Sequence, residues 1–194
     1  MAKNLDGTKT KENLLFAFIG ESQARNKYTY YASKAKNEGY AAIGKIFEET
    51  AGHEKEHAER LFKFLEDTEP VEIHNVFSSG KIGTTAENLQ EAINGEHHEY
   101  DEMYPTFAKI AREEGFPELA VVFENIGKAE VYHEQRYLKL LKDIEVKTLL
   151  AKNDLIVWKC TNCGYHIKSK NAPAKCPACN HDVGYFVEVD NILF

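Results

Sequence analysis

The sequence contains no cysteine before Cys160, and all four of its cysteines lie between Cys160 and Cys179. A secreted protein that relies on disulfides spreads its cysteines along the chain. The clustering therefore argues against a disulfide scaffold and indicates a metal site in a reducing compartment. The first residues, MAKNLDGTKTKEN, also lack the apolar core of a secretory signal. We therefore expect the protein in the cytoplasm.

The sequence also has no excess of basic residues: it contains 24 lysines and arginines and 31 aspartates and glutamates, which gives a net charge of -7. Nucleic-acid binding needs a basic face that neutralises phosphates, so we expect no nucleic-acid partner. The longest hydrophobic run, residues 14–19, is far shorter than the roughly 20 residues that span a membrane, so we expect no membrane partner. The 194 residues, 43% of them hydrophobic, suffice for one or two globular domains.

Helical periodicity runs through about residue 145, with glycine and proline mainly at plausible boundaries. We expect helices over residues 8–38, 41–68, 84–114 and 117–145. Gly39 and Gly115 suit helix ends, Thr84 and Glu87 form a capping box, and Pro117 suits a first helical turn. Short connections make two antiparallel hairpins, and a longer middle crossover joins them. This is the ferritin-like arrangement of the four-helix bundle.

An internal repeat supports this arrangement. Residues 36–61 resemble residues 112–137 at a constant shift of 76, which aligns Glu54 with Glu130 and His57 with His133. A shift of 75 aligns Glu21 with Glu96. The same helical hairpin is repeated in the sequence, so we expect a pseudo-two-fold axis in the bundle.

The character of the chain changes after Lys152. LIVWKC and GYFVEVDNILF read as strands, and the cysteines lie in turns between them. A module this small needs a cross-link or a bound metal to be stable, so we expect a metal to be part of its fold. The sequence thus predicts a mainly α protein with a four-helix bundle over residues 1–147 and a small β module with metal-binding turns over residues 148–194.

Two Glu-x-x-His pairs carry the chemistry of the bundle: Glu54 with His57, and Glu130 with His133. Residues three apart on a helix share a face, so each pair can point at one centre. Glu21 and Glu96 add one glutamate from each remaining helix, which completes the carboxylate di-iron pattern. A single such pair is usually a solvated face. Without metal, however, this set would bury several facing carboxylates at several kcal/mol each.

The repeat is broken at one informative place. Helix 84–114 has a second glutamate, Glu99, where helix 8–38 has Ala24. Five carboxylates then exceed the charge of a diferrous pair but not that of a diferric pair. A spare carboxylate should favour the oxidised state and a neutral His57 the reduced one, so we expect a site that cycles between the two.

Several tyrosines and histidines flank these ligands. Tyr28, Tyr100 and Tyr104 could hydrogen-bond to the glutamates, or they could be core aromatics at helical spacing. His53, His97 and His98 lie off the ligand line, and we interpret them as surface or packing residues.

Two Cys-x-x-Cys knuckles, Cys160 with Cys163 and Cys176 with Cys179, predict a tetrahedral sulfur site. The spacing fits zinc or iron, and taken alone it favours structural zinc. A redox-active bundle in the same chain favours iron, because cycling irons need an electron source.

The chain resembles the rubrerythrin family over essentially its whole length. The motifs are GESQARNKYTYYA around Glu21, EKEH, EHHE and EVYH in the bundle, then CTNCGY and CPAC. The resemblance implies a ferritin-like bundle followed by a rubredoxin-like domain. It implies di-iron ligands at six positions, with His57 binding in the reduced state in exchange for Glu99, and tyrosines that contact the ligand shell at Tyr28 and Tyr104. The six positions are Glu21, Glu54, Glu96, Glu99, Glu130 and His133.

The resemblance also implies a function. Similar proteins reduce hydrogen peroxide in defence against oxidative stress, with two irons in the bundle and one iron on the four cysteines, for which zinc can substitute. Electrons would come from an NAD(P)H-linked flavin reductase or a rubredoxin-like carrier, and similar proteins are homodimers. Two alternatives remain open: a ferroxidase, iron-storage or oxygen-reducing di-iron protein, and a non-enzymatic metal-binding protein with zinc on its cysteines.

Overall fold

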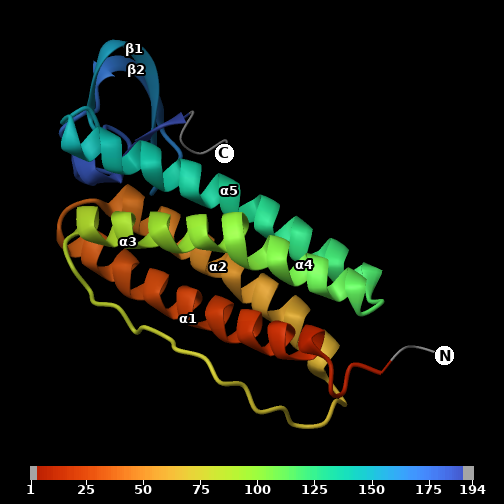
Figure 1. The fold of residues 1–194 in the computed structure, drawn as a ribbon. Coiled ribbons are helices and arrows are strands. Elements are labelled where there is room, and N and C mark those ends of the chain that lie inside the picture. The colour runs from red at the N-terminus through yellow and green to blue at the C-terminus, as the bar shows by residue number, and fades with distance from the viewer. Residues whose placement is uncertain (1–3, 190–194) are drawn as a thin grey trace.

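The computed structural model describes residues 4–189. In this part of the chain, long helices lie side by side as a bundle, and a small antiparallel sheet lies at one end (Figure 1). The helices are α1 (Lys9–Asn37), α2 (Ala41–Leu65), α3 (Thr85–His98), α4 (Tyr104–Glu113) and α5 (Pro117–Glu145). Because α3 and α4 form one continuous rod, the predicted fold class, a ferritin-like four-helix bundle with a small C-terminal module, is confirmed. Among the described residues, no helix is long and apolar enough to cross a membrane.

The helix ends follow the predicted signals. The Thr8 side chain caps α1 by accepting a hydrogen bond from the backbone N–H of Lys11. Thr84 and Glu87 form the expected capping box of α3. Helix α2 differs: it ends at Leu65 rather than near Thr68, because Glu66 already has extended backbone (ψ 139°) and Asp67 has a left-handed φ of 60°.

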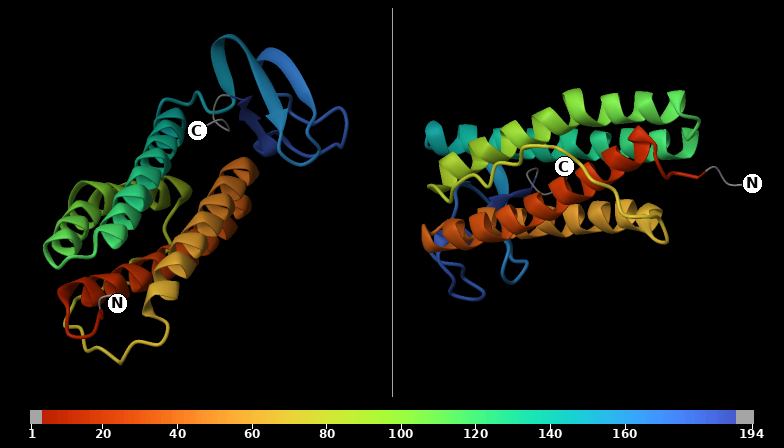
Figure 2. Two further views of the ribbon diagram at one scale, coloured as in Figure 1. Left: turned by 90° about the vertical axis from the view of Figure 1, so that its right-hand side faces the viewer. Right: turned by 60° about the horizontal axis from the view of Figure 1, so that its bottom comes forward.

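The crossover between α2 and α3 runs along the outside of the bundle past α1 (Figures 1 and 2). Its Phe77 ring stacks on Phe16 of α1 at 4.9 Å between centroids. The Gln23 side-chain amide donates a hydrogen bond to the backbone carbonyl of Ser78 at 2.7 Å. These contacts fasten the crossover to α1, and the expected pair of helical hairpins is present.

The third rod is not the uninterrupted helix that we expected. A π-helical turn, η1 (Glu99–Met103), separates α3 from α4, and the backbone N–H of Tyr104 bonds to the carbonyl of Glu99. Tyr28 follows Glu21 by seven residues on α1, whereas Tyr104 follows Glu96 by eight on the third rod. A π turn absorbs one extra residue in a helix. The interruption therefore keeps the two halves of the bundle in register on both sides of η1.

Two apolar clusters fill the bundle, one toward each end. One is built around Tyr31, Phe47, Leu89 and Leu140. The other is built around Leu14, Ala17, Leu61, Ala108 and Phe123. Along α1, Glu21 lies between Ala17 of one cluster and Tyr28 of the other. A buried polar layer is thus held between two hydrophobic layers, and each fully buried large side chain contributes about 1.5–3 kcal/mol.

The C-terminal module is a three-stranded sheet in the order β2-β1-β3. Its strands are β1 (Ala151–Cys160), β2 (His166–Asn171) and β3 (Phe186–Glu188). We did not predict β2, because HIKSKN is largely polar and carries little strand signal. Of the closing run 184–194, residues 186–188 form β3, and residues 190–194 lie outside the described part of the chain.

The module packs against the bundle where α2 begins. A side chain on Gly184 would lie 1.7 Å from the backbone carbonyl oxygen of Gly39, so the two backbones touch there. Lys45 of α2 donates a hydrogen bond to the carbonyl of Thr161, and Val187 joins the cluster around Phe47. The domain boundary between residues 147 and 148 stays a prediction, although it falls between α5 and β1.

Candidate metal centres

Six of the predicted side chains meet in the polar layer of the bundle. They form two overlapping sets of four, and both sets contain Glu54 and Glu130. The first set adds Glu21 and His57, and the second adds Glu96 and His133. Within each set the potential ligand atoms all lie within 4.8 Å of one another. Each set therefore offers one position for a metal ion.

The two shared glutamates face both positions. Oε2 of Glu54 lies 3.1 Å from Nδ1 of His57, and its Oε1 lies 3.3 Å from Nδ1 of His133. Oε1 of Glu130 lies 3.0 Å from His57 Nδ1, and its Oε2 lies 2.6 Å from His133 Nδ1. One carboxylate oxygen is directed to each side, which is the arrangement of a bridging carboxylate. Glu21 and Glu96 each lie beside a single histidine, at 3.5 Å, as terminal ligands would.

The hydrogen bonding of this layer shows that a metal pair fits it. Within residues 4–189, six ligand atoms are buried without a hydrogen-bond partner: Glu21 Oε2, Glu54 Oε1, Glu96 Oε2, both carboxylate oxygens of Glu130, and His133 Nδ1. Buried polar atoms are normally satisfied. Hard oxygen donors with imidazole suit iron, and the arrangement is that of a carboxylate-bridged di-iron site.

Protons balance part of the charge of these residues in the metal-free protein. Burial raises the pKa of Glu21 to about 8, and burial also raises the pKa of Glu96 well above its usual range. Burial works against protonated His57, but the neighbouring carboxylates of Glu130, Glu21 and Glu54 raise its pKa to about 12. Burial would also raise the pKa of Glu130, yet the imidazoles of His133 and His57 beside it lower the pKa to about 2. Metal ions must displace these protons.

Glu99 lies near the two sets but belongs to neither. Its side chain is partly buried on η1, and burial followed by the charges of Glu21 and Glu96 raises its pKa. Ala24 occupies the corresponding place on α1. The fifth carboxylate is therefore close enough to interact with the others while standing outside the two sets.

Two of the flanking tyrosines contact the terminal glutamates. Tyr28 of α1 donates a hydrogen bond to Oε1 of Glu96, and Tyr104 of α4 donates one to Oε1 of Glu21. Both tyrosines are buried. Tyr100 differs, because its hydroxyl donates to Glu134 at 2.9 Å instead of to a glutamate of the metal layer.

One histidine has a contact that the sequence interpretation missed. His53 is exposed at the surface of α2, as expected, but its ring lies beside that of His133 and nearly parallel to it, with centroids 5.3 Å apart and planes at 12°. His97 and His98 are exposed as predicted, pairing with Glu134 and Glu102. The contact between His53 and His133 joins two different helices. The spacing of residues within α2 therefore gives no sign of it.

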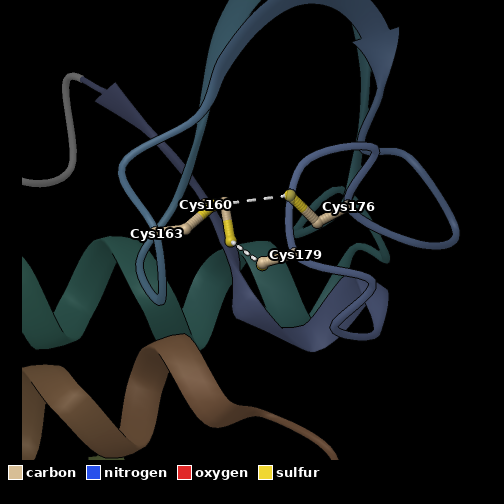
Figure 3. A group of neighbouring side chains, drawn as sticks. All are labelled: Cys160, Cys163, Cys176 and Cys179. Atoms are coloured by element: carbon tan, nitrogen blue, oxygen red, sulfur yellow. Dashed lines mark hydrogen bonds between the residues drawn. The ribbon is translucent and has the colours of Figure 1, made fainter.

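The four cysteines form a second centre in the C-terminal module (Figure 3). Sγ of Cys160 lies 3.7 Å from Sγ of Cys179, and Sγ of Cys163 lies 3.7 Å from Sγ of Cys176. A tetrahedral ion with metal–sulfur bonds of about 2.3 Å places its sulfurs about 3.8 Å apart. The distances fit a tetrahedral metal and are far too long for disulfides.

The two knuckles share one backbone design. The N–H of Cys160 bonds to the carbonyl of Tyr165, and the N–H of Cys176 bonds to that of His181 in the same way. The residue after each second cysteine has a left-handed φ: 78° at Gly164 and 59° at Asn180. A hydrogen bond from the backbone N–H of His181 lowers the pKa of Cys179 to about 6. The turn thus stabilises the thiolate that a metal needs.

The C-terminal aromatic residues build a small core over this centre. Trp158 and Phe186 are buried together with Cys160 and Cys176, and Tyr165 packs against them.

Comparison with known proteins agrees with both centres. The family model described as rubrerythrin matches residues 12–141, and the model described as the rubredoxin-like domain of rubrerythrin matches residues 158–187. A rubrerythrin of Porphyromonas gingivalis is 52% identical over 96% of this chain and 92% of its own length. A rubrerythrin of Nitratidesulfovibrio vulgaris is 48% identical over 95% of this chain and 96% of its own.

Solved structures extend the likeness to the fold. A structure titled as the fully reduced, all-ferrous state of nigerythrin matches with a TM-score of 0.64 at 32% identity, covering 96% of this chain and 92% of that one. The matched regions contain both the carboxylate–histidine layer and the four cysteines. The chain therefore belongs to the rubrerythrin family.

Proposed function

We propose that this protein reduces hydrogen peroxide to water at the carboxylate–histidine layer and recovers its electrons through the four-cysteine centre. The observation that carries the proposal is the pair of glutamates, Glu54 and Glu130, each directing one oxygen to either metal position. A bound iron pair supplies the two electrons that one peroxide requires and the Lewis acidity that polarises its O–O bond.

The protein holds this pair through seven side chains. Glu54 and Glu130 would each offer one oxygen to either ion, Glu21 and Glu96 would each hold one ion, and His133 would hold its ion in both oxidation states. Glu99 and His57 would be alternative ligands: the carboxylate would suit the oxidised pair, which has charge to neutralise, and the imidazole would suit the reduced pair. The position of Glu99 supports this exchange, since it is near enough for the charges of Glu21 and Glu96 to raise its pKa, yet it stands outside the two sets.

Tyr28 and Tyr104 hold the terminal glutamates by donating hydrogen bonds to Glu96 and Glu21. The oxygens that accept these bonds are Oε1 in both residues, which leaves each Oε2 directed at its histidine. The tyrosines therefore fix the orientation of the carboxylates without occupying the oxygens that face the metal positions.

The electron path and the biological setting are part of the proposal. Iron on Cys160, Cys163, Cys176 and Cys179 would pass single electrons to the pair, received from an NAD(P)H-linked flavin reductase or a rubredoxin-like carrier. We propose a homodimer in which the cysteine centre of one chain serves the metal pair of the other. The reaction would protect the cytoplasm against oxidative stress, and the clustering of all four cysteines between Cys160 and Cys179 supports a reducing compartment.

The test is stopped-flow mixing of the anaerobically reduced protein with hydrogen peroxide, followed by visible absorption. Oxidation of both centres should be much faster with peroxide than with air-saturated buffer. Equal or slower oxidation with peroxide would remove the proposal and favour a ferroxidase, iron-storing or oxygen-reducing protein. A colourless cysteine centre after growth in ample iron would indicate zinc and a non-enzymatic role.

Glu99→Ala tests the ligand exchange separately. This variant should retain metal but turn over more slowly, because the oxidised pair loses the carboxylate that stabilises it. Glu102→Ala is the matched control: it removes the same charge from the same π turn, but the Glu102 side chain is exposed and pairs with His98. Normal turnover by Glu99→Ala would refute the exchange.

A further inference from the structure

The two histidines of the metal layer differ on the side that faces away from the metals. Nε2 of His133 lies 3.1 Å from Nδ1 of His53, and the planes of the two rings differ by only 12°. His57 makes its contacts through Nδ1, and among residues 4–189 its Nε2 has no hydrogen-bond partner. The repeat explains the difference: at the shift of 76 that aligns His57 with His133, His53 aligns with Ala129.

The direction of the hydrogen bond follows from the metal layer. Nδ1 of His133 is the nitrogen that faces Glu130, Glu54 and Glu96. A nitrogen that binds a metal uses its lone pair, so the ring hydrogen of His133 belongs on Nε2. That N–H then donates to Nδ1 of His53, which must itself be unprotonated, with its own hydrogen on Nε2.

From this asymmetry we infer that His53 is a positioning residue, which fixes the ring and the tautomer of His133, and that His57 can leave its metal because it has no such partner. The inference rests on the proposed function only for the departure of His57. An outer hydrogen bond holds a metal-bound imidazole in one orientation. Where the bond is missing, the imidazole can turn away without breaking a hydrogen bond.

Two variants of His53 and one of Ala129 test the hydrogen bond. His53→Phe keeps a flat ring against His133 but removes the acceptor. His53→Asn restores a side-chain acceptor without the ring. Ala129→His places a histidine where it can accept a hydrogen bond from His57. His53 is exposed and Ala129 is partly exposed, so each change is compatible with folding, which thermal unfolding can verify.

The measurement uses zinc-loaded protein and needs no turnover. In ¹⁵N–¹H NMR, His133 of the unmodified protein should show an Nε2–H that exchanges slowly with water and a metal-bound Nδ1. His53→Phe should lose this slow exchange, and the metal-bound His133 signal should decay roughly 10-fold faster when a chelator is added. His53→Asn should restore both properties at least in part.

Retention of the slowly exchanging Nε2–H and of the zinc release rate in His53→Phe would overturn the inference. Ala129→His should give His57 its own protected N–H, and in the iron-loaded protein it should shift the reduction potential of the pair upward, because it holds the ligand of the reduced state. An unshifted potential would refute the role of the missing partner. The zinc results stand apart from peroxide reduction, so failure of the proposed function would leave them intact.

Discussion

Tyr28 and Tyr104 occupy equivalent places in the two halves of the bundle, and each donates its hydroxyl to the terminal glutamate of the opposite half. Tyr28 on α1 bonds to Glu96 on α3, and Tyr104 on α4 bonds to Glu21 on α1. The pseudo-two-fold relation between the helices therefore includes the hydrogen bonds around the metal layer as well as the ligands.

Tyr28→Phe and Tyr104→Phe should have similar effects because of this reciprocity. Each removes one donor from a buried carboxylate, and loss of such a partner typically weakens metal binding 10–100-fold. We expect about a 10-fold loss of zinc affinity for each variant, measured by competition with a chelator. Tyr100→Phe is the control, since its hydroxyl bonds to Glu134 outside the metal layer. A Tyr100 effect equal to that of Tyr28 would contradict the assignment.

The π turn predicts the outcome of a deletion. Removing Asp101, an exposed residue of η1, would make the Glu96–Tyr104 spacing equal to the Glu21–Tyr28 spacing. The third rod should then become a regular α-helix with its buried faces on both sides unchanged. We expect a folded protein that loses less than about 2 kcal/mol of stability in denaturant unfolding.

The matched control for this deletion is the removal of Gln135, an exposed residue of the uninterrupted helix α5. That deletion rotates every following core residue, including Tyr137 and Leu140, by about 100°. It should prevent folding or cost several kcal/mol. Equal damage by the two deletions would show that η1 does not accommodate the extra residue.

The convergence of the six glutamate and histidine side chains could be predicted because helical periodicity is regular. Glu54 and His57 share a face in any α-helix, and the repeat transfers that face to Glu130 and His133. The π turn was missed although its signal was present, since the repeat shift changes from 75 at Glu96 to 76 at Gly115. A change of one residue within a helix requires an interruption.

Other features depend on contacts between elements and could not be predicted from periodicity. Which glutamates face both metal positions depends on the packing of α2 against α5. The contact between His53 and His133 joins the same two helices. The strand β2 is stabilised by its pairing with β1, as at Trp158 and Ile167, while its own residues are mostly polar.

The pKa shifts predict how pH affects the metal-free protein. The pKa of Glu21 is raised to about 8 by burial, so its contribution to stability is present below its usual pKa of about 4.5 and lost as pH rises through 8. The pKa of His57 is raised to about 12 by its glutamate partners, against the effect of burial. Its contribution to stability is likewise lost as pH rises above about 6.5. Raising the pH from 5 to 9 should therefore destabilise the metal-free bundle.

We expect its melting temperature to fall by roughly 4–8 °C over this range, corresponding to at least about 2 kcal/mol. The melting temperature of the zinc-loaded protein should instead rise over this range. Metal binds only deprotonated ligands, so the affinity of the protein for zinc increases as pH rises. Calorimetry of both forms at several pH values is the measurement. A metal-free melting temperature that rises between pH 5 and 9 would contradict the assigned shifts.

The contact between Gly184 and Gly39 predicts how the C-terminal module is held. Alanine at 184 would place its methyl carbon 1.7 Å from the Gly39 carbonyl oxygen, so the module must move away from the start of α2. Gly184→Ala should therefore speed proteolytic cleavage between α5 and β1 by at least about 10-fold, while the visible spectrum of the cysteine-bound iron stays unchanged. Gly52→Ala is the control, because a methyl group at that exposed position of α2 meets nothing within 4 Å beyond the adjoining backbone of its own helix and should stabilise the helix by about 1 kcal/mol. If Gly184→Ala is cleaved at the rate of the unmodified protein, the two glycines do not determine the docking, and the contact through Lys45 and Val187 must suffice to hold the module.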